Sequence, residues 1–234
     1  MLTRKIIPTE DGSATIFIPE WNESYHSRHG AVQEAYHVFI RNGLDFLRNK
    51  KEISILEIGF GTGLNSFITL VESFGKNQQI HYTGLEKYPV SEEEFSMLNY
   101  PKSLKEFNSN LNFSEAELSQ FYTELMYAEW EKEVQINENF NLTKIQDDFM
   151  NFNYPENTFD LVYFDAFGAR VQPELWTDVL FEKIYKSMKK DAVFTTYSAK
   201  GSVRRALISV GFQVEKKPGP PGKREMLVGF KVGE

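Results

Sequence analysis

The spacing of apolar and polar residues divides the chain into short strands and helices. Two apolar runs on either side of a turn at Glu10-Asp11-Gly12 predict a β-hairpin over residues 3–18. Apolar residues at helical spacing predict helices over 32–47, 64–73, 173–188 and 201–210. Short apolar or β-branched runs predict seven further strands, at 53–58, 80–86, 142–146, 159–164, 192–196, 212–216 and 225–230.

The order of these elements predicts an α/β fold with a mostly parallel, seven-stranded sheet. Strand 53–58, a glycine turn, helix 64–73 and strand 80–86 form a β-α-β unit, which implies parallel strands and a right-handed crossover. The segment 218–222, Pro-Gly-Pro-Pro-Gly, is not helical, so the last two strands form a hairpin and one C-terminal strand is antiparallel.

The length of 234 residues suits one domain, 1–234. Within it we expect an N-terminal hairpin and helix extension over 1–50. The polar segment 91–140, which is rich in Glu, Phe and Leu, is expected to form a helical insertion beside the sheet.

Composition excludes several classes of protein. The chain has no cysteine, which removes disulfides, thiolate metal sites and cysteine nucleophiles. The N-terminal residues lack the apolar run of a secretory signal, and no apolar stretch approaches the roughly 20 residues that span a bilayer. We therefore expect a cytoplasmic protein without a membrane partner. His26, His29 and His37 have spacings that match no metal-binding pattern, so we expect no metal.

The charge is unevenly distributed along the chain. The net charge is −7, but residues 183–234 hold 12 Lys+Arg against 4 Asp+Glu, a balance of +8, which leaves −15 for residues 1–182. A basic C-terminal quarter can present a positive face to a polyanion. Taken alone, however, the charge pattern favours an ordinary solvated surface, so a nucleic-acid partner needs a second line of evidence.

The most informative segment is the glycine loop, residues 56–65, Leu-Glu-Ile-Gly-Phe-Gly-Thr-Gly-Leu-Asn. Glycines at a strand-to-helix turn permit positive φ and let a ligand approach the backbone. A dinucleotide fingerprint needs Gly or Ala at its sixth position, but counting from Gly59 gives Leu64 and counting from Gly61 gives Ser66. The pattern Glu-x-Gly-x-Gly-x-Gly instead resembles the first motif of Rossmann-like methyltransferases, which predicts S-adenosylmethionine as cofactor, held by Glu57, Gly59, Gly61, Gly63 and Asn65.

Acidic residues follow the next two strands of the predicted sheet. Glu86 ends strand 80–86, where a carboxylate can accept hydrogen bonds from both ribose hydroxyls, and Lys87 follows it. Asp147, Asp148 and Phe149 follow strand 142–146, where methyltransferases of this fold hold the adenine amine. Asp148 is the preferred candidate. By type alone, each of these acids also suits a solvated loop.

Asp165 and Phe167 follow strand 159–164, where a topological switch point opens a ligand crevice. An amine has a pKa near 10, like that of lysine, and must lose its proton before its lone pair attacks a methyl group. A carboxylate at residue 165 can orient the amine and accept that proton, and Phe167 can exclude water. The simpler alternative is an aspartate that caps the next turn.

Several separate motifs resemble the MnmC/MnmD family, the methyltransferases that complete 5-methylaminomethyl-2-thiouridine at the wobble position of tRNA. The similarity covers most of the chain, in the segments Tyr25-His26-Ser27, Gly30, Glu34, 37–39, 57–65, Asp165-x-Phe167, Pro173-x-x-Trp176, 196–199, Gly201, 203–205, 211–212 and 223–227. The resemblance implies methyl transfer from S-adenosylmethionine to the amine of a 5-aminomethyl-2-thiouridine base. Asp165 and Phe167 then take the family's catalytic positions, and Tyr25 joins the cofactor site.

The resemblance also changes the interpretation of the basic C-terminal quarter. Lysines and arginines in the matching segments are expected to bind phosphates of the anticodon stem-loop, with Lys216 and Lys217 adding to the same face. An extruded base is expected to stack on Tyr197. The substrate-binding candidates are Tyr197, Lys200, Arg204, Arg205, Lys223 and Arg224.

In many members of the family this unit is fused to an oxidoreductase that makes the amine, and no second nucleotide-binding loop follows here. We therefore expect a separate oxidoreductase to supply the precursor, unless none is needed. Ala169 stands where the family often has proline. Other functions stay open at this point: a methyl- or aminopropyl-transferase acting on a small-molecule amine, a cofactor-binding module without catalysis, and a nicotinamide oxidoreductase.

Overall fold

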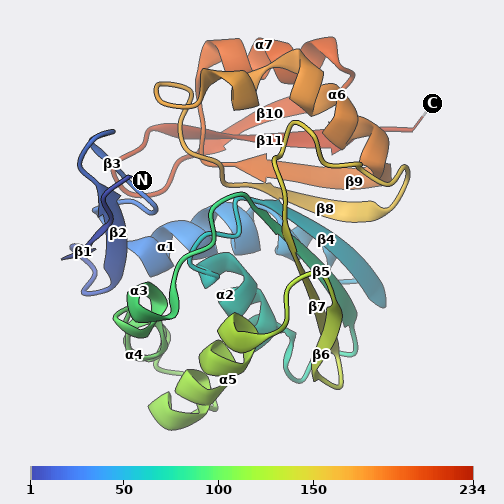
Figure 1. Ribbon diagram of the computed structural model, residues 1–234. Coiled ribbons are helices and arrows are strands. Elements are labelled where there is room, and N and C mark those ends of the chain that lie inside the picture. The colour runs from blue at the N-terminus through green and yellow to red at the C-terminus, as the bar shows by residue number, and fades with distance from the viewer. Residues whose placement is uncertain (1, 234) are drawn as a thin grey trace.

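The computed structural model describes residues 2–233, which form two β-sheets and the helices around them (Figure 1). The N-terminal sheet has three antiparallel strands in the order β1-β2-β3, and the main sheet has eight in the order β10-β11-β9-β8-β4-β5-β7-β6. The strands are β1 Lys5–Pro8, β2 Ala14–Ile18, β3 Glu23–Ser24, β4 Glu52–Ile58, β5 Gln79–Glu86, β6 Glu133–Asn137, β7 Phe140–Gln146, β8 Phe159–Phe164, β9 Met188–Thr196, β10 Gln213–Pro218 and β11 Glu225–Lys231.

The centre of the main sheet is parallel, as the β-α-β pattern predicts. β9, β8, β4, β5 and β7 run in one direction, and β11 lies antiparallel between β9 and β10. The predicted C-terminal hairpin and antiparallel strand are thus confirmed. The predicted count of seven strands was wrong, because β6 adds an eighth, antiparallel to β7 at the edge.

The segment 91–140 holds helices, as expected, and also strand β6. Ser91 and Ser114 begin two of the helices with capping boxes, in which each serine accepts a backbone hydrogen bond from a glutamate three residues later. β6 was missed because its sequence, Glu-Val-Gln-Ile-Asn, is short and half polar, as expected for an edge strand that needs little burial.

Helices cover both faces of the main sheet (Figure 1). α6 and α7 pack on one face, and α1, α2, α4 and α5 contribute to the core on the other. β4 alternates between the two cores, with Ile53 and Ile55 on one side and Leu56 and Ile58 on the other. The helices are α1 Ala31–Ala35, α2 Leu64–Ser73, α3 Glu92–Ser96, α4 Tyr100–Phe107, α5 Glu115–Tyr127, α6 Asp178–Ser187 and α7 Gly201–Ser209.

Two predicted helices are divided in the structure. The segment 32–47 forms α1, then a π-helical turn at Tyr36–Arg41 and a 3-10 helix at Leu44–Leu47. Gly43 separates the last two elements; a Cβ there would lie 2.3 Å from the Phe39 carbonyl oxygen, so the chain turns where only glycine fits. The segment 173–188 begins with a 3-10 helix at Pro173–Trp176, and α6 follows.

The topology gathers the predicted site residues at one edge of the main sheet. The chain leaves β4 toward β5 on one side and later returns through β8 on the other, so the carboxyl ends of β4 and β8 flank a switch point. The N-terminal sheet is tied over this edge at two places. Arg4 donates to the carbonyls of Tyr88 and Pro89 and pairs with Glu94, and Arg170 pairs with Glu23.

No helix within residues 2–233 has the length and apolar character that a membrane crossing requires.

Candidate active site

The glycine loop leaves β4 with three residues in the positive-φ region. Gly59, Gly61 and Gly63 have φ of +92°, +50° and +73°, and Gly63 is the N-cap of α2. A Cβ on Gly59 would lie 2.8 Å from the Asp165 carbonyl oxygen, and one on Gly61 would lie 3.1 Å from the Tyr25 ring. The loop therefore needs glycine both for its backbone conformation and for its close approach to the neighbouring elements.

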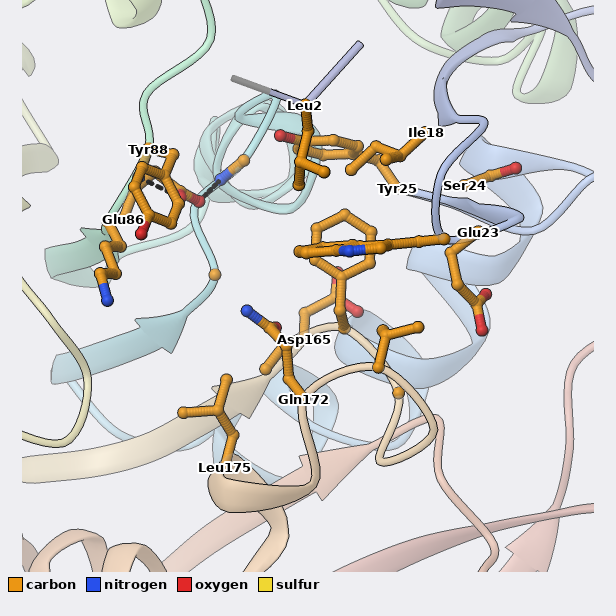
Figure 2. Close-up of a pocket in the computed structure, with 18 of the residues that line it drawn as sticks. Leu2, Ile18, Glu23, Ser24, Tyr25, Glu86, Tyr88, Asp165, Gln172 and Leu175 are labelled. Atoms are coloured by element: carbon orange, nitrogen blue, oxygen red, sulfur yellow. Dashed lines mark hydrogen bonds between the residues drawn. The ribbon is translucent and has the colours of Figure 1, made fainter. Parts of the chain in front are cut away.

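A cavity of about 1430 Å³ opens beside this loop, between the main sheet and the N-terminal sheet. Glu86 lies at one end of it and Glu23 at the other, with Tyr25 and Asp165 between them (Figure 2). Eleven of the residues predicted from the sequence line this cavity: Tyr25, Gly59, Gly61, Glu86, Lys87, Asp148, Phe149, Asp165, Phe167, Tyr197 and Lys223.

Glu86 and Asp148 are the carboxylates at one end of the cavity. Glu86 is buried and accepts hydrogen bonds from the backbone N–H of Gly61 at 3.0 Å and of Tyr88 at 2.8 Å. Its burial raises the pKa of the carboxyl above the usual value. Asp148 accepts from Lys87 at 2.6 Å, which lowers its pKa. Asp147 lies outside the cavity lining, so the structure brings only the preferred member of this pair to the site.

Asp165 is held by a chain of hydrogen bonds from beneath the glycine loop. The Asn65 amide donates to Asp165 Oδ2 and to Glu57 Oε1, both at 2.9 Å, and Tyr82 donates to Glu57 Oε2 at 2.8 Å. Glu57 is fully buried, and neither it nor Asn65 or Gly63 lines the cavity. The predicted strand-end acid is therefore placed to support Asp165 through Asn65, because its own oxygens are already hydrogen-bonded.

The surroundings of Asp165 raise the pKa of its carboxyl toward neutral pH. Burial raises the pKa of the carboxyl to about 7, and the negative charge of Glu34 acts in the same direction. The Asn65 hydrogen bond and the positive charge of Lys223 oppose this shift. A carboxyl with a pKa near 7 is ionised in a large fraction of molecules at neutral pH and can hold a proton that it accepts.

Aromatic rings form another part of the cavity wall. Phe167 contacts Trp21 and Tyr25 edge to face, with ring centroids 5.2 and 5.0 Å apart, and its carbonyl oxygen accepts from Trp176 Nε1 at 2.7 Å. Tyr197 donates its hydroxyl to the Ala166 carbonyl at 2.8 Å. These contacts fix the loop that carries Asp165 and make the adjoining surface apolar.

The predicted basic residues fall into three groups. Lys200, Arg205 and Arg224 are exposed, and no ion pair to them is found within residues 2–233. Arg204 is half-buried, with a buried Nε that has no partner in the same range. Lys216, Lys217 and Lys223 are paired with Glu225, Glu215 and Glu34. Lys223 also lines the cavity.

The three N-terminal histidines have separate partners. His26 bonds the Thr62 hydroxyl, His29 pairs with Glu10, and His37 bonds the Pro218 carbonyl. No group of three or more His, Asp or Glu side chains in the described part of the chain has the arrangement of a metal site.

Sequence reasoning missed Trp21, Glu34 and Arg4 as cavity residues. All three precede the glycine loop in the sequence. They were missed because glycine spacing and strand ends indicate only residues that follow a predicted strand of the main sheet. Glu34 belongs to a segment that resembles the MnmC/MnmD family, and this resemblance was the one signal that marked it.

Comparison with known proteins assigns the chain to a family. The family described as S-adenosyl-L-methionine-dependent methyltransferase matches residues 112–232. The chain belongs to this family. The part that matches includes Asp148, Asp165 and Phe167, whereas the glycine loop, residues 56–65, precedes it in the sequence.

Two further matches cover nearly the whole methyltransferase chain. It is 31% identical over 221 residues to the tRNA 5-methylaminomethyl-2-thiouridine biosynthesis bifunctional protein MnmC of Marinomonas sp., covering 90% of this chain and 31% of that protein. The crystal structure of MNMC2 from Aquifex aeolicus superposes with a TM-score of 0.77 at 26% identity, covering 98% of this chain and 70% of that one. The chain thus spans about a third of the length of the curated relatives it matches.

A spermidine synthase structure shares the fold. It superposes with a TM-score of 0.53 at 12% identity and covers 94% of this chain and 69% of that one. At this level of identity the likeness shows the fold of the methyltransferase and leaves its substrate open.

The lining of the methyltransferase cavity suits its family's cofactor in charge. S-adenosylmethionine carries hydroxyl groups, an amine and a positively charged sulfur. Carboxylates suit these groups, and Glu86, Asp148 and Asp165 all line the cavity.

Proposed function

We propose that this chain methylates the primary amine of a 5-aminomethyl-2-thiouridine base at the wobble position of tRNA. The observation that carries the proposal is the Asp165 carboxyl, which lies beside the glycine loop with a pKa near 7. The relatives that match most of the chain are named for biosynthesis of the methylated base, which supports the choice of substrate.

In this proposal the Asp165 carboxylate accepts the proton of the substrate amine. An alkylamine is mostly protonated at neutral pH and has no lone pair to react. The Asp165 carboxylate attracts the ammonium group, accepts its proton and orients the nitrogen. When bound, S-adenosylmethionine would supply a methyl group on a positively charged sulfur to the neutral amine nitrogen and would leave as the thioether S-adenosylhomocysteine. Phe167, Trp21 and Tyr25 keep water from the reacting groups.

The cofactor would be held by residues from three strand ends. Gly59 and Gly61 let its methionine part approach the backbone, and Glu86 accepts hydrogen bonds from the ribose hydroxyls. Asp148 is placed to accept from the adenine amine, with Phe149 beside it. Glu57 and Asn65 act from below by fixing the position of Asp165.

The tRNA would be held by the exposed cations at the same edge of the sheet. Lys200 follows β9, and Arg224 precedes β11, whose start lies at the carboxyl-end edge because β11 runs opposite to β9. Arg205 lies one turn into α7. The target base must leave its stack to reach the cavity, where Tyr197 and Phe167 offer ring surfaces. An oxidoreductase acting before this step would supply the amine.

Neutralising Lys200, Arg205 and Arg224 together to glutamine is expected to weaken tRNA binding and to reduce its dependence on salt. Each lost phosphate contact lowers the slope of log affinity against log salt by about 0.7–0.9, so three should lower it by about 2–3. Fluorescence anisotropy with labelled tRNA between 50 and 200 mM salt measures this. A matched triple variant, Lys102, Lys132 and Lys186 to glutamine, removes three cations outside this set, each paired with a glutamate three or four residues away in the sequence. Equal slopes in the two variants would refute the assignment of this face.

The proposed reaction is tested by nucleoside mass spectrometry. The purified chain is incubated with S-adenosylmethionine and tRNA that carries 5-aminomethyl-2-thiouridine, and the nucleosides are then separated. Conversion of that base to its methylated form is expected. Absence of conversion, with methylation of a polyamine under the same conditions, would replace this function by that of a small-molecule amine transferase.

A further inference from the structure

The cavity contains an ion pair that the proposed reaction does not use. Lys223, in the turn between β10 and β11, donates to Glu34 Oε1 at 2.6 Å. Glu34 comes from α1, is buried, and also accepts from the Ser27 backbone N–H at 2.8 Å. The Lys223 ammonium lies 3.9 Å from the centre of the Tyr197 ring, and all three side chains line the cavity with Asp165.

The β10–β11 turn is also held in place by other contacts. His37 already bonds the Pro218 carbonyl at 2.7 Å, and Gly222 packs closely on the His29 ring. A buried ion pair is in general weak evidence for stability, because desolvation offsets its attraction. Its position beside the reacting carboxyl therefore calls for an explanation in terms of the site.

The charged groups that face Asp165 come from several elements. Glu57 on β4 reaches it through Asn65, Glu34 approaches from α1, and Lys223 approaches from the β10–β11 turn. Tyr197 adds a neutral hydroxyl, because burial raises the pKa of Tyr197 well above the usual value of a tyrosine. Glu34 and Lys223 act on Asp165 in opposite directions, and each is held by the other.

We infer that Glu34 and Lys223 are positioning residues for the transfer step, in which Glu34 holds the Lys223 ammonium beside Asp165 and that ammonium favours the neutral form of the substrate amine. A fixed positive charge repels a protonated amine and leaves a neutral amine unaffected. The negative charge of Glu34 offsets part of the Lys223 charge, so the pKa of Asp165 is lowered less than an unpaired ammonium would lower it. The inference rests on the proposed function for its substrate, but the pair's action on Asp165 can be measured without any substrate.

The direct test is the titration of Asp165, followed by carbon-13 NMR of the aspartate carboxyl carbons in the free protein and assigned with Asp165→Asn. Glu34→Gln removes a negative charge and is expected to lower the Asp165 midpoint by about one pH unit. Lys223→Met removes a positive charge and should raise it by a similar amount. The double variant should return close to the wild-type midpoint, because the two effects cancel.

A matched control comes from the same hairpin. Lys216 pairs with Glu225 at 2.8 Å across β10 and β11 but does not line the cavity, so Lys216→Met should leave the Asp165 titration unchanged. A purely structural role for the Glu34–Lys223 pair predicts no shift, or shifts of the same sign in both single variants. Either result would overturn the inference.

Kinetics supply a second measurement. The acid limb of the pH profile of kcat should move with the Asp165 midpoint, down in Glu34→Gln and up in Lys223→Met, and Lys223→Arg should restore most of the wild-type profile. Affinity for S-adenosylhomocysteine, measured by calorimetry, should stay within about twofold. If the Asp165 midpoint moves down in Glu34→Gln and up in Lys223→Met but the protein does not methylate tRNA, only the proposed substrate is overturned. If the protein methylates tRNA but the midpoint does not move in this way, only the role of the pair is overturned.

Discussion

Replacing Asp165 by asparagine is expected to lower kcat for methyl transfer by about 10²–10⁴-fold, the range that a positioned acid or base contributes. Asparagine keeps the size of the side chain and an oxygen that can accept from Asn65, but it can take no proton. Affinity for the cofactor should change little. Single-turnover assays and calorimetric titration with S-adenosylmethionine measure the two quantities separately.

The pH dependence of the wild-type enzyme should report the same carboxyl. Because the ionised form is active and burial raises the pKa of Asp165 to about 7, kcat should fall as the pH decreases through 7. A carboxyl whose pKa is higher in the folded than in the unfolded state is less stable as a carboxylate in the folded protein. The free energy of unfolding therefore falls as the pH rises from the pKa of the unfolded state to about 7. Asp165→Asn should therefore raise Tm by several degrees at pH 8.

The control for this variant is Asp178→Asn, at an exposed position where α6 begins. Asp178→Asn should leave kcat unchanged and should not raise Tm at pH 8. An Asp165→Asn enzyme that retains full turnover, or one that loses cofactor binding in the same proportion as turnover, would show that Asp165 is not the residue that handles the amine's proton.

Replacing Gly59 by alanine is expected to remove measurable cofactor binding and to destabilise the fold by about 1–3 kcal/mol. Gly59 has a φ of +92°, and its Cβ would lie 2.8 Å from the Asp165 carbonyl oxygen, a backbone atom that cannot rotate away. The loop must then move away from Asp165, so the cradle and the carboxyl no longer face the same space. Calorimetric titration and thermal unfolding measure the two effects.

Gly75→Ala separates the two causes of this effect. Gly75 has a φ of +70°, but nothing lies within 4 Å of its Cβ position, and it is remote from the cavity lining. It should therefore cost about 1 kcal/mol in backbone strain and leave cofactor affinity unchanged. Similar losses of affinity in both variants would mean that the Gly59 effect is a general loss of stability.

Local signals made the centre of the fold predictable from sequence. β4, the glycine loop, α2 and β5 are consecutive, and their bounds were predicted within one residue because strand, turn and helix patterns follow each other directly. The position of Asp165 opposite Gly59 also followed, since the parallel order places the ends of β4 and β8 side by side.

The features that were missed depend on long-range contacts. The break of helix 32–47 near Gly43 arises where Phe39 and β9 approach the chain, and Thr195 donates to the Val38 carbonyl there. The pairing of Glu34 with Lys223 joins residues 189 positions apart and has no local pattern. Charge patterning indicated a basic C-terminal quarter but could not show that Lys223 turns into the cavity while Lys200 faces solvent.

A crystal structure with S-adenosylhomocysteine would test the central claim most directly, namely that the glycine loop and Asp165 enclose one reaction site. We predict the ligand's homocysteine part against Gly59 and Gly61, its ribose hydroxyls on Glu86, and its sulfur facing the space in front of the Asp165 carboxyl. A ligand bound elsewhere, or an Asp165 side chain turned away from the sulfur, would contradict the account.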